Sequence, residues 1–125
     1  MCFHLGVAMV FTHELDAMSN HEWRVLPFLK SMPDDIGMTV FVLAHIPIFA
    51  TVVALVASLN IRTRTAARMI ISAFLLFHGL LHALHVNHSN YEFSGLLSNT
   101  LIFGGAILGA LYIVATIVQK DGKVT

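Results

Sequence analysis

Three apolar stretches dominate this sequence, and each is long enough to cross a membrane as a helix. They cover about residues 36–59, 66–86 and 93–118, and a spanning helix needs about 20 mostly apolar residues. A soluble domain of 125 residues could not hide so much apolar surface in one core. Of all residues, 57% are hydrophobic and 11% are charged, and the mean hydropathy is +0.79. The sequence therefore predicts a membrane protein.

A fourth apolar segment, residues 2–18, is shorter and contains His4, His13, Glu14 and Asp16. It has no basic region of the kind that begins a signal peptide, so we interpret it as a retained helix. Its polar half must face protein or water rather than lipid. The expected fold is all-α, an integral membrane four-helix bundle that forms a single domain over residues 1–125.

The connections between the spans carry information about topology. Residues 20–32 mix charged and apolar side chains around Trp23, which predicts a short interfacial helix between the first two spans. Basic residues prefer the cytoplasmic side of a membrane, so the arginines of the second loop and the lysines after the fourth span predict that both termini are cytoplasmic. We expect the bacterial inner membrane as the location. The basic residues in question are Arg62, Arg64, Arg68, Lys120 and Lys123.

Histidines form a column near the end of the third span. His78, His82 and His85 lie four and seven residues apart, within an arc of about 60° on one helix face. Polar groups at this depth are costly and usually functional. Cys2 is the only cysteine, so a metal would take nitrogen and oxygen ligands. The column predicts a site for a divalent transition metal, with zinc or iron as the first candidates.

The first span supplies partners for this column. In an antiparallel bundle the end of the first span and the end of the third span lie on the same side of the membrane. Glu14 is the first candidate for a general base and Glu92 the second. The predicted metal ligands are His13, Asp16, His78, His82 and His85.

Several functions are compatible with such a site. One is a metal-dependent membrane enzyme that acts on a lipid-like substrate entering from the bilayer. Another is an accessory subunit of a membrane complex that binds haem or a tetrapyrrole, with His45 opposite His78 at a similar depth. A third is a proton or ion path along the histidines. The formal net charge is zero, so nucleic acid is not an expected partner.

Several short motifs carry a resemblance over nearly the whole chain. The chain resembles a group of small, functionally uncharacterised bacterial membrane proteins of four spans with a His-Glu-Leu-Asp motif. It is more distantly similar to small membrane proteins named for a His-x-x-Glu-Glu motif, with Asp16 and Ala17 where that motif has two glutamates. The resemblance implies a polar site within the membrane and no assigned reaction. The motifs are Thr12-His13-Glu14-Leu15-Asp16-Ala17-Met18, His21-Glu22-Trp23-Arg24, His78-Gly79-Leu80-Leu81-His82 and Tyr91-Glu92-Phe93.

Overall fold

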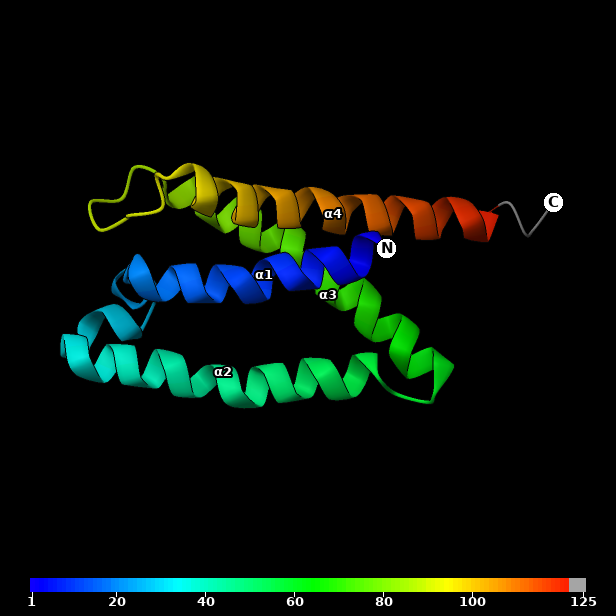
Figure 1. The fold of residues 1–125 in the computed structure, drawn as a ribbon, viewed down its shortest axis with the longest axis horizontal. Helices are drawn as coiled ribbons and strands as arrows, with labels where there is room; N and C mark the ends of the chain where they lie inside the picture. Colours follow the sequence, from blue (N-terminus) through cyan, green and yellow to red (C-terminus); the bar gives the residue numbers. More distant parts are fainter. Residues whose placement is uncertain (122–125) are drawn as a thin grey trace.

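The computed structural model describes residues 1–121 and confirms an all-α fold, with no strand in this range. Figure 1 shows α1 in the middle of the molecule, with α4 along one side and α2 along the other. Helix α3 starts near the end of α2 and crosses to lie beside α4. The elements are α1 (Cys2–Ser19), the 3-10 turns η1 (Glu22–Arg24) and η2 (Leu29–Ser31), α2 (Asp34–Val56), α3 (Ile61–His85) and α4 (Leu96–Asp121).

Three of these helices, α2, α3 and α4, are long and apolar enough to cross a membrane. Many of their large apolar side chains point away from the rest of the chain, and Leu43, Ile46, Leu80 and Ile107 are all more than half exposed. Such wide apolar exposure is unusual in a soluble monomer and is typical of helices that face lipid. Helix α1 is not among the helices that reach this hydropathy.

The helix ends follow from local chemistry. The Asn60 side chain accepts hydrogen bonds from the backbone N–H groups of Arg62 and Thr63, so it caps the start of α3. Asp34 and Asp35 occupy the first turn of α2, where negative charge is favourable next to the helix dipole. The Asn60 cap determines where α3 begins, and so which residues of α3 reach the far end of the bundle.

Two glycines allow α3 and α4 to approach closely. A methyl group on Gly109 would lie 2.6 Å from the backbone oxygen of Ser72, and one on Gly79 would lie 2.7 Å from the Cβ of Ala106. Neither position has room for a side chain, so the two helices are in backbone contact along this seam. The seam fixes the rotation of α3, and with it the face on which the histidine column lies.

The connection between α1 and α2 differs from the predicted interfacial helix, which is not confirmed. Residues 20–32 form the two 3-10 turns instead, because His21 and Phe28 both have positive φ angles, of 49° and 71°, which no continuous right-handed helix accepts. The turns fold the segment back onto the bundle and bury Glu22 and Trp23. Trp23 Nε1 donates a hydrogen bond to Asp34, which ties η1 to the start of α2.

Candidate metal centre

Three histidine rings from two helices meet at the end of the bundle where α1 ends. The ring of His13, from α1, lies 4.9 Å from the ring of His78 and 5.0 Å from that of His82, both on α3. The two α3 rings are 4.6 Å apart. One nitrogen from each ring can be chosen so that all three atoms lie within 4.8 Å of one another. Helices α1 and α3 thus face each other through these histidines, as expected for residues 2–18 and 66–86.

The three rings are shielded from solvent, and two of them have ring nitrogens without a hydrogen-bond partner. His13 is 0% exposed, His82 is 6% exposed and His78 is 9% exposed. Both ring nitrogens of His13 and Nε2 of His78 are buried without a hydrogen bond. Buried polar atoms in folded proteins nearly always have a partner, so this arrangement leaves nitrogen donors available to a ligand. A metal ion that accepts imidazole nitrogens would satisfy them.

A buried carboxylate that was not among the residues predicted for the site completes the cluster. Glu22 Oε2 lies 3.4 Å from His13 Nε2. Burial alone would raise the pKa of Glu22, but the contact with His13 and the nearby imidazoles of His78 and His82 outweigh burial, so the pKa is lowered from its ordinary value. The cluster therefore contains a negative charge that would offset part of the charge of a bound cation.

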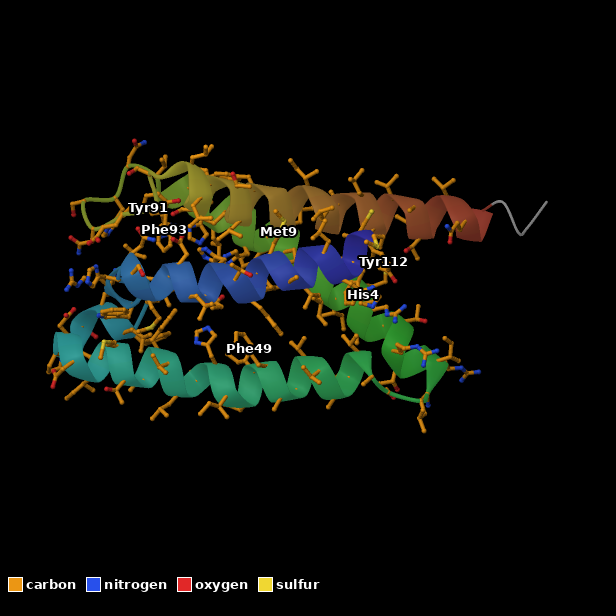
Figure 2. All side chains as sticks on the ribbon, in the orientation of Figure 1. His4, Met9, Phe49, Tyr91, Phe93 and Tyr112 are labelled. Carbon is orange, nitrogen blue, oxygen red and sulfur yellow. The ribbon has the colours of Figure 1, made fainter. Side chains whose placement is uncertain are left out.

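The loop before α4 forms one wall of the site. Tyr91 Oη lies 3.2 Å from His82 Nδ1, a distance that allows a hydrogen bond. The Phe93 ring is 1% exposed and lies 4.9 Å from His82 and 5.3 Å from His13. Figure 2 shows Tyr91 and Phe93 together at this end of the molecule, far from His4 at the other end. Phe93 was expected to begin the fourth span, but α4 begins at Leu96, because the Phe93 side chain turns into the core.

A cavity of about 160 Å³ borders the cluster. Its polar wall is made by Glu22 and by side chains of α3 and the following loop, and the rest of its wall is apolar. The cluster therefore borders a cavity through Glu22, His78 and His82, whereas His13 and Phe93 are buried and do not line it. The lining residues are Glu22, Val25, Leu26, Pro27, His78, Leu81, His82, His85 and Tyr91.

A second polar pair joins α1 to α2. Glu14 Oε2 lies 2.9 Å from His45 Nε2, and His45 Nδ1 donates a hydrogen bond of 2.7 Å to the backbone oxygen of Phe41. Both ring nitrogens of His45 are therefore engaged. Glu14, the first candidate for a general base, faces α2 in this structure, and His45, the candidate haem ligand, faces α1.

The other predicted site residues lie around the cluster. His85 lines the cavity, and its Nδ1 donates a 2.9 Å hydrogen bond to the backbone oxygen of Leu81. Asp16 has one buried carboxylate oxygen, Oδ2, without a hydrogen bond. Glu92 is at the surface, where its Oε2 lies 3.0 Å from His21 Nδ1. None of these three belongs to the group of ligand atoms that His13, His78 and His82 form.

Comparison with known proteins identifies one family. The model of a family of unknown function, DUF6713, matches residues 1–119. No curated protein and no solved structure matches the chain.

Proposed function

The chain belongs to the DUF6713 family of unknown function, and we propose that it is a four-span membrane protein that holds a divalent transition metal at one end of its bundle. The proposed ligands are His13, His78 and His82, and zinc or iron is the proposed metal. The convergence of three buried imidazoles carries this proposal, because the unpaired nitrogens of His13 and His78 would gain a partner in the ion.

The proposal includes α1 as a fourth span. His13 faces the α3 histidines, and Glu14 pairs with His45 of α2, so neither polar side chain faces lipid, which removes the main objection to placing this helix in the bilayer. The arginines near the start of α3 favour a cytoplasmic position for that end and an outward-facing position for the metal site. The inner membrane of a bacterium would suit this arrangement.

The site also has the features of a reactive centre. Three protein ligands leave a coordination position open, as in catalytic zinc sites, where the metal makes a bound water more acidic. Glu22 is closer to the three histidines than the surface residue Glu92, and unlike Glu14 it contacts one of them directly. We therefore favour Glu22 as the general base. The apolar walls of the adjoining cavity suit a lipid-like substrate.

Metal content tests the proposal. The protein would be purified without a nickel column from cells grown with sufficient metal, and its metals measured by elemental analysis. We expect about one zinc or iron ion per chain in the unmodified protein, and loss of the ion in His13→Ala and His82→Ala because each removes a ligand. His4→Ala is the matched control, since His4 is an exposed histidine at the other end of α1.

Circular dichroism and gel filtration would show that each variant still folds. Equal metal in all four proteins, or none in the unmodified protein, would overturn the proposal. A visible absorption spectrum typical of haem in the unmodified protein would instead favour the accessory-subunit hypothesis.

A further inference from the structure

A second cavity lies at the opposite end of the molecule, between α1, α2 and the first part of α3. Its volume is about 280 Å³. Apart from His4 and Arg68, every side chain that lines it is apolar. The lining residues are Phe3, His4, Val7, Phe11, Val52, Val53, Val56, Ala57 and Arg68. This cavity shares no residue with the metal centre and takes no part in the proposed function.

Arg68 is the charged group in this cavity, and its charge is not matched within the described side chains. Its guanidinium carbon lies 5.5 Å from the centre of the Phe3 ring, and its Nε is buried without a hydrogen bond. No carboxylate forms an ion pair with it in the described part of the chain. By contrast, Arg64 donates a hydrogen bond to the backbone oxygen of Ser58, and Arg24 pairs with Asp34. A buried guanidinium nitrogen normally has an anionic or carbonyl partner.

The chemistry of the cavity defines its ligand. An apolar lining with one unpaired guanidinium at its wall fits a molecule with a hydrocarbon chain and an anionic group. Arg68 lies seven residues after the start of α3, about 10 Å along the helix at 1.5 Å per residue. It is therefore in the same end of the helix as Arg62 and Arg64. At that depth a long arginine side chain can reach the level of lipid headgroups.

We propose that this cavity binds an anionic phospholipid of the bilayer, with part of an acyl chain against Val7 and Val56 and the phosphate group at Arg68. The volume lies slightly below the range of about 300–1,000 Å³ found for pockets that enclose a whole small molecule, so it suits a segment of an acyl chain. Basic pockets between membrane helices on the cytoplasmic side bind lipid headgroups in the same way. The proposal depends only on the membrane part of the proposed function and is independent of the metal.

Native mass spectrometry of the purified, delipidated protein tests this. Phosphatidylglycerol and phosphatidylcholine with identical acyl chains would be added separately in detergent. We expect the unmodified protein to retain phosphatidylglycerol at least about tenfold better, and Arg68→Gln to lose this preference, because the variant lacks the charge-assisted bond to phosphate. Arg62→Gln removes the same charge from an exposed position on the same helix and should retain the preference.

A second pair of variants tests the cavity without changing the charge. Val7→Trp would fill it and should lower phosphatidylglycerol binding by a similar factor, whereas Ala8→Trp places the same indole side chain on the exposed face of α1 and should not. Equal retention of the two lipids, or equal binding by the Val7→Trp and Ala8→Trp proteins, would overturn the proposal. So would full displacement of the lipid by millimolar inorganic phosphate, since that would identify a simple anion site. Metal content measured in the same samples reports on the metal centre separately.

Discussion

Replacing Glu22 by glutamine removes one negative charge from the metal centre and changes its volume very little. Carboxylates that contact a ligating histidine typically strengthen metal binding by about 10- to 100-fold. The 3.4 Å separation between Glu22 Oε2 and His13 Nε2 is longer than the roughly 2.7–2.9 Å of a charge-assisted hydrogen bond. We therefore expect an effect near the lower limit of that range. A loss of about tenfold in metal affinity corresponds to about 1.4 kcal/mol.

The assay is a competition between the protein and a coloured chelator, with zinc added to metal-free protein in detergent. Glu92→Gln is the matched control, because Glu92 is an exposed glutamate that also pairs with a histidine, His21, but lies outside the cluster. Its affinity should equal that of the unmodified protein. Unchanged affinity in Glu22→Gln would refute the assignment of Glu22 to the site. A loss of more than about 1,000-fold, as expected on removal of a ligand, would mean that Glu22 binds the ion itself.

Two further predictions concern the bundle and its orientation. Gly109→Ala should lower the free energy of unfolding by about 1–3 kcal/mol in a thermal melt in detergent, because the new methyl group would overlap the backbone of Ser72. Gly95→Ala is the control and should have no such effect, because its new methyl group would come no closer than 3.8 Å to Ser98 Oγ. Equal melting of the two variants would count against a tight seam between α3 and α4. A reporter enzyme fused after residue 125 should be active only if it functions in the cytoplasm, and activity of a periplasmic reporter there would reverse the proposed orientation.

The sequence alone was sufficient to identify the three helices that are apolar enough to span a membrane and to identify the histidine cluster. Helical periodicity places His78 and His82 on one face regardless of what surrounds them. Short loops then make the end of α1 a neighbour of the end of α3, which brings His13 to the same place. Local rules of helix geometry and chain connection were therefore enough for these residues.

Glu22, Tyr91 and Phe93 could not be assigned in the same way, because they lie in connections whose path depends on tertiary packing. The positive φ angle of His21 directs Glu22 inward, and nothing in the residue type of His21 requires that conformation. Phe93 continues the apolar pattern of α4, so periodicity alone assigned it to the helix, while the structure packs it against the rings of both His13 and His82. One signal was available for Glu22: it stands beside Trp23, a large apolar residue that favours burial.

The central position of α1 has a consequence for how the protein would enter the bilayer. Helix α1 is synthesised before α2, α3 and α4, yet it is the one of these four that is not apolar enough to qualify as a spanning helix by composition. Inserted alone, it would expose His13 and Glu14 to lipid, which costs several kcal/mol for each unsatisfied polar group. Glu14 pairs with His45 of α2 and His13 packs against the histidines of α3, and both of these helices are synthesised later. We therefore expect α1 to remain at the membrane surface until α2 and α3 are in place, so that it would be made before them and integrated after them.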